Sequence, residues 1–202
     1  MTVINKNHHN TYEHFLTENE CELVRVTALA NEEQILNIPN PVYRRNPTGY
    51  TGLTAQHTVY NWLSNDTIKG LNIPQRLFDL PDFEDTTTIA IQCWMNILRQ
   101  QERLETHSHG EEHDGFYALN IFISGNTTTG THYEDIGYRP NNIGEITIAS
   151  NFLEHGVPSH LFREPRISMA MDIWLDEYPD ELENAENRIL TFHRPHYDVK
   201  KL

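Results

Sequence analysis

Apolar and polar residues alternate with a period of two from about Thr86 onward, and this alternation predicts β-strands. The longest run covers residues 89–98 and reads as a strand with both faces partly buried. Gly and Pro mark the loops between the runs, and no helical pattern separates them. Further strands are expected at about residues 102–109, 115–123, 130–135, 145–149 and 166–174. The pattern predicts a mainly β protein, an antiparallel double-stranded β-helix of jelly-roll type.

The first 85 residues follow a different pattern, polar and interrupted by turn sequences such as Pro39-Asn40-Pro41. Helical spacing predicts two helices here, at about residues 29–37 and 55–64. After the last strand, residues 180–190 are expected to form one acidic amphipathic helix. We therefore expect residues 1–85 to be a helical elaboration that packs on a barrel. Residues 86–202 would form that barrel and its C-terminal helix, in one compact domain overall.

The amino-acid composition indicates which kinds of partner and which cellular compartment to expect. Fifteen Lys and Arg residues against 29 Asp and Glu give a net charge of -14, which disfavours nucleic acid and anionic membranes. Cys21 and Cys93 are expected to be buried thiols in a reducing compartment rather than a disulfide. No stretch approaches the ~20 apolar residues of a membrane span. We expect a soluble cytoplasmic protein that acts on a small-molecule or peptide substrate, with a homodimer as one possible assembly.

Three histidines form the most informative pattern of the chain. His107 and His109 stand two residues apart at the end of a predicted strand, so they project to the same face. His155 follows 46 residues after His109, and a folded-back sheet would bring it alongside. Imidazole nitrogens bind first-row transition metals well. The chain has 12 histidines, so the His-x-His pair alone is a weak signal, and its weight depends on the residues around His155.

A glycine and a hydrophobic strand over residues 144–154 lead into His155-Gly156-Val157, and Arg166-Ile167-Ser168 opens the last apolar strand. In this order the chain resembles the Fe(II)/2-oxoglutarate-dependent oxygenases, in particular their small prolyl-hydroxylase-like branch. The resemblance covers about residues 89–175. It includes Trp94-Met-Asn96 and Phe116-Tyr117-Ala-Leu119-Asn120 on either side of the first two histidines. It implies that His155 is the distal ligand of Fe(II), and that Arg166 binds the far carboxylate of 2-oxoglutarate with help from Ser168.

Strand alternation supports the role of Arg166 independently. Ile167, Met169, Met171 and Ile173 share one apolar face of the last strand, whereas Arg166 and Ser168 share the other. An Arg that points into a barrel needs an anion, and a bound dicarboxylate would supply it; an ion pair with Glu164, Asp172 or another acid is the structural alternative. Four further residues remain open between strand packing and contact with a ligand: Tyr117 and Asn120 for 2-oxoglutarate, and Gln92 and Asn96 for the substrate.

The first histidine pair departs from the family pattern, which is His-x-Asp or His-x-Glu at this position. All three histidines, His107, His109 and His155, are the predicted metal ligands. Alternatively His107 and His155 bind with an acid from elsewhere, such as Asp114 or Asp135. His132-Tyr133-Glu134 is a literal His-x-Glu, but it lies only 21 residues before His155, which leaves too little chain for the intervening strands.

The resemblance predicts a 2-oxoglutarate-dependent dioxygenase that uses Fe(II) and hydroxylates an unidentified amino acid, peptide or small molecule. Two other hypotheses remain. One is a cupin-type metalloenzyme with a three-histidine site and no 2-oxoglutarate. The other is a jelly-roll binding module without catalytic activity, in which the histidines are incidental.

Overall fold

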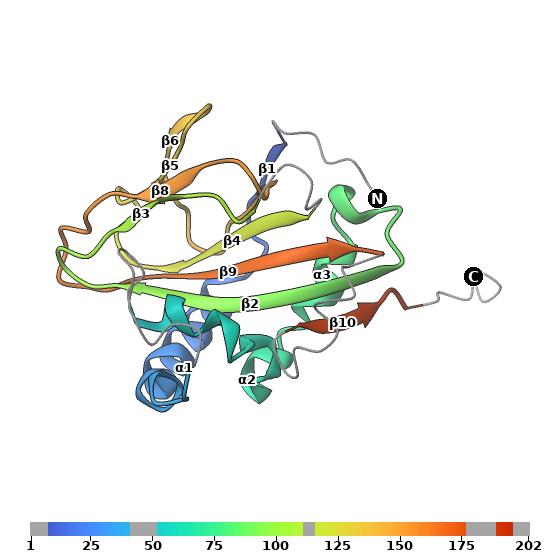
Figure 1. Cartoon of the computed structure of the whole chain (residues 1–202), viewed down its shortest axis with the longest axis horizontal. Helices are drawn as coiled ribbons and strands as arrows, with labels where there is room; N and C mark the ends of the chain where they lie inside the picture. Colours follow the sequence, from blue (N-terminus) through green and yellow to red (C-terminus); the bar gives the residue numbers. More distant parts are fainter. Residues whose placement is uncertain (1–7, 41–51, 111–115, 177–188, 196–202) are drawn as a thin grey trace.

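The structure is a computed structural model, and it describes residues 8–40, 52–110, 116–176 and 189–195. Two antiparallel sheets face each other in this part of the chain, and helices cover the outer face of the larger sheet (Figure 1). The predicted mainly β jelly roll is confirmed. Among the described residues, no helix is long and apolar enough to cross a membrane.

The larger sheet has six strands in the order β1-β7-β4-β9-β2-β10. Their bounds, in that order, are His9–Tyr12, Ile146–Ser150, Tyr117–Ser124, Arg166–Leu175, Thr88–Leu98 and Leu190–His193. The smaller sheet has the order β3-β8-β5-β6, with bounds Leu104–His107, His155–Val157, Thr131–Tyr133 and Gly137–Arg139. The long central strands β2 and β9 pair along ten residues, and they give the larger sheet its rigid middle.

The strand predictions for residues 86–175 hold, with two differences in detail. His155 was expected at the end of a strand that begins near residue 145, but β7 ends at Ser150 and His155 begins a strand of its own, β8. The chain turns at residues 151–153, and so it passes from β7 in the larger sheet to β8 in the smaller one. The strand expected at 130–135 is only Thr131–Tyr133 (β5), and a strand that was not predicted, β6, returns beside it as a hairpin.

The helices differ more from expectation. The helix expected at 29–37 is the end of α1 (Glu18–Leu36), which begins eleven residues earlier at a capping box formed by Thr17 and Glu20. The helix expected at 55–64 is two 3₁₀ segments, η1 (Gly52–Thr58) and η2 (Trp62–Ser64). Short helices follow: α2 (Asp66–Lys69), α3 (Ile73–Phe78) and η3 (Pro81–Phe83).

Both ends of the described chain add a strand to the larger sheet, which the sequence did not predict. At the N-terminal side β1 pairs with β7, and at the C-terminal side β10 pairs with β2. The helix expected over residues 180–190 lies outside the described residues except for its last two positions. Leu190 begins β10 rather than ending a helix.

The two faces of the larger sheet have different roles. One face packs against the helices, and it is apolar because alternate residues of β2, β4 and β9 are Ile, Leu, Met or Cys. Cys21 and Cys93 are both buried free thiols in this core, as expected, and they form no disulfide. The other face looks toward the smaller sheet and carries most of the polar side chains that are buried in these strands. The site lies on this second face.

Gly144 offers a test of how the N-terminal segment is joined to the sheet. Its φ is +79°, and an added Cβ would lie 2.0 Å from the carbonyl oxygen of Leu16. We expect Gly144→Ala to lower the free energy of unfolding by roughly 2–4 kcal/mol, measured by urea denaturation, because backbone strain and a backbone clash combine.

The matched control is Gly137→Ala. Gly137 also has a positive φ, of +84°, but an added Cβ there meets nothing within 4 Å. We expect it to cost only about 1–2 kcal/mol, from the left-handed backbone alone. Equal losses in the two variants would show that the contact between Gly144 and Leu16 contributes nothing.

Candidate metal centre and its cavity

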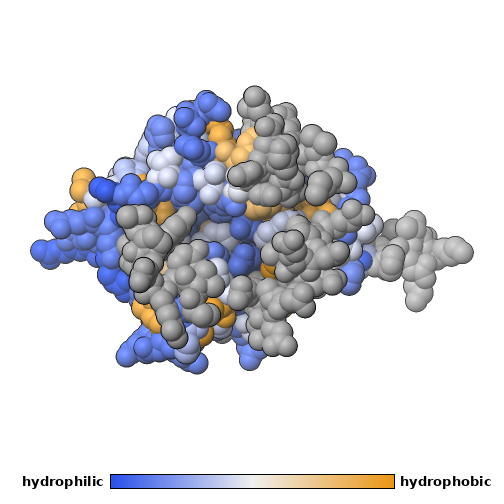
Figure 2. Space-filling view, in the orientation of Figure 1, coloured by the Kyte–Doolittle hydropathy of each residue, from blue (hydrophilic) through white to orange (hydrophobic). Residues whose placement is uncertain are grey.

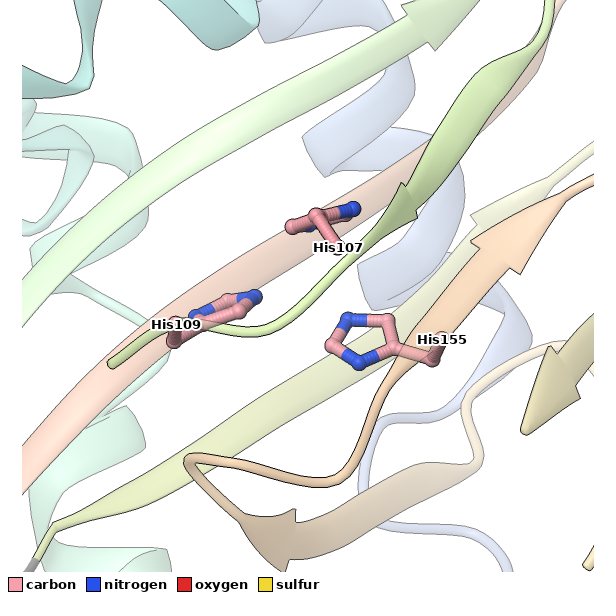
Figure 3. A group of neighbouring side chains, drawn as sticks. All are labelled: His107, His109 and His155. Carbon is pink, nitrogen blue, oxygen red and sulfur yellow. The ribbon is translucent and has the colours of Figure 1, made fainter. Parts of the chain in front are cut away.

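The three histidines predicted from the sequence come together in the structure (Figure 3). His107 at the end of β3 lies directly opposite His155 at the start of β8. His109 follows two residues later, where its backbone N–H donates to the carbonyl of Asn151 at 2.7 Å. One ring nitrogen from each histidine lies within 4.8 Å of the other two. Among the described residues, this is the group of His, Cys, Asp and Glu side chains that is arranged to hold a metal ion.

Hydrogen bonds fix how each ring is turned. His107 Nδ1 lies 2.8 Å from the carbonyl oxygen of Glu105, and His155 Nδ1 lies 2.9 Å from that of Leu153. His109 Nδ1 lies 2.5 Å from a carboxylate oxygen of Asp172. A carbonyl or carboxylate oxygen accepts, so each Nδ1 carries the hydrogen and each Nε2 keeps its lone pair. Metal-binding histidines are commonly oriented by a hydrogen bond of this kind from the other ring nitrogen.

The site also favours neutral imidazoles. Burial, together with a smaller contribution from the nearby His109 and His107, lowers the pKa of His155 to about 3. Burial likewise lowers the pKa of His107. Metal ligands must be unprotonated, so these two rings are in the form that a metal requires at neutral pH. The nitrogens of three converging histidines fit a first-row transition metal.

A cavity of about 230 Å³ opens beside the histidines, between the two sheets. Its floor is the polar face of the larger sheet, where Ala118, Ala149 and Ala170 occupy neighbouring strands. Because these side chains stop at Cβ, they leave space under the histidines that longer side chains would fill. Small residues on one face of the sheet thus create the volume that a ligand would occupy.

Arg166 lies at the wall of the same cavity and is only 1% exposed. Its Nε donates to the carbonyl of Thr129 at 3.2 Å. The other contacts are long: 3.4 Å from Nη1 to Ser168 Oγ and 3.4 Å from Nη2 to Thr131 Oγ1. Burial lowers the pKa of Arg166 to about 10, which still leaves it charged at neutral pH.

No described acid forms an ion pair with Arg166, so the structural alternative raised by the sequence is wrong within the described part of the chain. Asp172 pairs with His109 instead, and Glu164 is exposed. A buried charge without a counter-ion is costly. The guanidinium, with two hydroxyls beside it, therefore lies in a setting that suits an anion.

The other predicted residues do not all reach the cavity. Ser168, Asn120 and Asn96 line the cavity, whereas Gln92 does not and donates its amide to the carbonyl of His57 at 2.8 Å. Tyr117 also does not line it. Residues three apart on a strand project to opposite faces, so Tyr117 and Asn120 cannot share the site.

Tyr117 belongs to the core on the other face of β4. Its ring centroid lies 4.8 Å from that of His8 and 5.9 Å from that of Phe83. We therefore leave it out of the co-substrate site.

Of the two acids considered as third metal ligands, the structure describes only Asp135, which does not join the histidines. Asp135 is exposed in the turn between β5 and β6, outside the histidine group, and Asp114 lies outside the described residues. His132 and Glu134 are exposed as well, because β5 turns Tyr133 inward and its two neighbours outward. The rejection of His132-Tyr133-Glu134 as the ligand motif agrees with this arrangement.

Several cavity residues were not predicted from the sequence, among them Thr131, Tyr133 and Thr147. The Tyr133 ring lies 5.6 Å from that of His155, and burial raises the pKa of Tyr133 to about 12, so it remains a neutral phenol. Alternation along residues 130–135 would have placed Thr131 and Tyr133 on one face. It does not say which face looks inward, since that depends on the pairing with β8.

No protein-family model matches the sequence, and no curated protein matches it significantly. Solved structures do match the fold. One is SnoN, a non-heme alpha-ketoglutarate-dependent epimerase from nogalamycin biosynthesis, with 10% identity, a TM-score of 0.59, and 94% of this chain and 81% of that chain covered. AviO1 from Streptomyces viridochromogenes Tue57 has 11% identity, a TM-score of 0.61 and coverage of 86% and 92%.

HygX from Streptomyces hygroscopicus, solved with nickel and 2-oxoglutarate bound, has 10% identity, a TM-score of 0.56 and coverage of 83% and 82%. Identities this low establish the fold alone. At the level of the fold, these structural matches confirm the resemblance to Fe(II)/2-oxoglutarate-dependent oxygenases that the sequence showed.

The contact between Asp172 and His109 gives a direct test of the candidate metal centre. We expect Asp172→Asn to weaken Fe(II) binding by about 10- to 100-fold, since an amide holds the ring in place less well than a carboxylate does. Anaerobic titration calorimetry would measure this. Glu105→Gln removes an equal charge nearby, from a side chain that pairs with Arg103, and should leave the affinity unchanged. If both variants weaken Fe(II) binding equally, the loss of negative charge explains the change, and the contact between Asp172 and His109 does not.

Proposed function

We propose that this protein is an Fe(II)/2-oxoglutarate-dependent oxygenase that acts on a small-molecule or peptide substrate. The observation that carries the proposal is Arg166, a buried guanidinium with no acid beside it among the described residues, in the same cavity as three converging histidines. The fold supports this assignment, because proteins of similar fold are described with 2-oxoglutarate and a metal bound.

His107, His109 and His155 would hold the metal through Nε2. Bound together, Fe(II) and 2-oxoglutarate supply the activation of O₂ and the oxidising power for attack on an unactivated C–H bond. The chain's own contribution is to aim the three rings at one point. Asp172 does this for His109, and two backbone carbonyls do it for the other rings.

Arg166 would bind the far carboxylate of 2-oxoglutarate. Ser168 and Thr131 each place a hydroxyl 3.4 Å from a different terminal nitrogen of the guanidinium. The Ser168 hydroxyl would donate to the same carboxylate, whereas the Thr131 hydroxyl donates to Asn141 Oδ1 at 3.5 Å. Asn120 lines the cavity and adds an amide. The phenol of Tyr133, buried beside His155, closes this end of the cavity against water.

The substrate would enter on the side of η1 and β2, where Thr54, His57, Trp94 and Asn96 line the cavity. The Thr54 hydroxyl donates to Asn96 Oδ1 at 2.7 Å, which orients the amide group of Asn96. These side chains are uncharged or aromatic, which suits a polar substrate group without a negative charge. We propose hydroxylation as the outcome. The buried free thiols fit the reducing cytoplasm as its compartment.

A second candidate function is favoured by one feature, the third histidine in place of the usual acid. A cupin-type metalloenzyme with three histidine ligands would use the same metal centre and no 2-oxoglutarate. It leaves the charge of Arg166 without an explanation, so we rank it second.

Anaerobic calorimetry with Fe(II) and then 2-oxoglutarate separates the two functions. We expect Arg166→Met to weaken 2-oxoglutarate binding by about 50- to 100-fold, the equivalent of a charge-assisted hydrogen bond of roughly 2–3 kcal/mol, and to leave Fe(II) binding unchanged. Its thermal stability should stay the same or rise, because the variant removes a buried charge that has no acid partner. Arg163→Met, at an exposed arginine three residues earlier, is the control and should bind as the unaltered protein does.

Metal binding without any effect of 2-oxoglutarate would favour the cupin-type enzyme. Absence of stoichiometric metal binding would contradict both enzymes and leave a binding module without catalytic activity.

A further inference from the structure

His160 is a buried histidine that the proposed chemistry does not use. It is 0% exposed and lies in the loop between β8 and β9, outside the metal group. Its backbone is fixed to the turn after β2: its N–H donates to the carbonyl of Glu102 at 2.8 Å, and its carbonyl accepts from Gln101 at 2.6 Å. The imidazole is thus held in a fixed place, and both of its nitrogens are engaged.

The ring nitrogens of His160 have distinct partners. Nε2 lies 2.5 Å from the carbonyl oxygen of Glu164, so Nε2 carries a hydrogen and donates. Nδ1 lies 3.3 Å from the hydroxyl of Thr129, which can donate to it. The ring therefore connects the loop that precedes β9 with the loop that precedes β5.

Thr129 continues this connection to Arg166. Its side chain meets His160, and its own carbonyl accepts from Arg166 Nε at 3.2 Å and from Asn141 Nδ2 at 3.1 Å. The bond to Nε sets the rotation of the guanidinium, because that group is planar and its nitrogens have fixed directions. A shift of Thr129 would turn the two terminal nitrogens away from the space beside Ser168 and Thr131.

We infer that His160 is a positioning residue for the co-substrate, which acts through Thr129 on the orientation of Arg166. The inference rests on the proposed function. It predicts a specific pattern: loss of the link between His160 and Thr129 should weaken binding of the far carboxylate of 2-oxoglutarate and leave both the metal and the 2-oxo acid end unaffected. A role in packing alone predicts no such selectivity.

Thr129→Val tests this with little change in shape, since it replaces only the hydroxyl. We expect it to weaken 2-oxoglutarate binding about fivefold in the Fe(II)-loaded protein, by anaerobic calorimetry, as the loss of one buried hydrogen bond would. Thr129→Ser keeps the hydroxyl and should stay within about twofold of the unaltered protein. His160→Leu should weaken binding at least as much as Thr129→Val does.

A second ligand makes the test selective. 2-Oxobutyrate has the 2-oxo acid end but no far carboxylate, so its affinity and that of Fe(II) should be the same in all these variants. The inference is overturned if Thr129→Val binds 2-oxoglutarate as Thr129→Ser does, or if it weakens both acids equally. Arg166→Met, included in the same series, reports on the proposed function by itself. If it leaves 2-oxoglutarate binding unchanged, the co-substrate assignment fails rather than the positioning role alone.

Discussion

A guanidinium that is almost completely buried needs a compensating negative charge, and within the described chain Arg166 has none. The charge is held instead by one carbonyl, two hydroxyls and the ring of Phe122, whose centroid lies 5.5 Å from the guanidinium carbon. These partners orient the group without neutralising it. Such an arrangement lowers stability unless a ligand completes it, and that is the physical reason to place a carboxylate there.

The alternation of β9 brings this charge and the metal centre to one cavity. Arg166, Ser168, Ala170 and Asp172 follow one another on the same face of the strand. The first two belong to the proposed anion site, Ala170 leaves the space between, and Asp172 holds His109. The opposite face of β9 is apolar and buried against the helices. One strand thus joins the core, the anion site and the support of the metal centre, so a change in its register would disrupt all three.

The sequence predicted those parts that depend on local periodicity or short spacing. Alternation gave the strands, and the two-residue spacing gave the pairs His107 with His109 and Arg166 with Ser168. The sequence was less informative where pairing between distant segments decides which residues form a strand. His155 lies on a strand separate from β7. The strands β1 and β10 each pair with an edge of the larger sheet, which local sequence patterns do not reveal.

Tyr117 shows the same limit: its strand was predicted, but which face looks inward depends on how β4 sits between β7 and β9. The start of α1 was missed for a different reason. Its first half carries exposed apolar residues, Leu23 and Val26, as well as buried ones, so no clear apolar face marks it. The capping box of Thr17 and Glu20 marks the start more clearly than hydrophobicity does.

A crystal structure of the protein with nickel and 2-oxoglutarate bound would test the central claim most directly, because nickel occupies such a site without turnover. The account predicts nickel on Nε2 of His107, His109 and His155, with the far carboxylate of 2-oxoglutarate against Arg166, Ser168 and Thr131. Nickel held by other residues, or a carboxylate that leaves Arg166 without an anion, would contradict it.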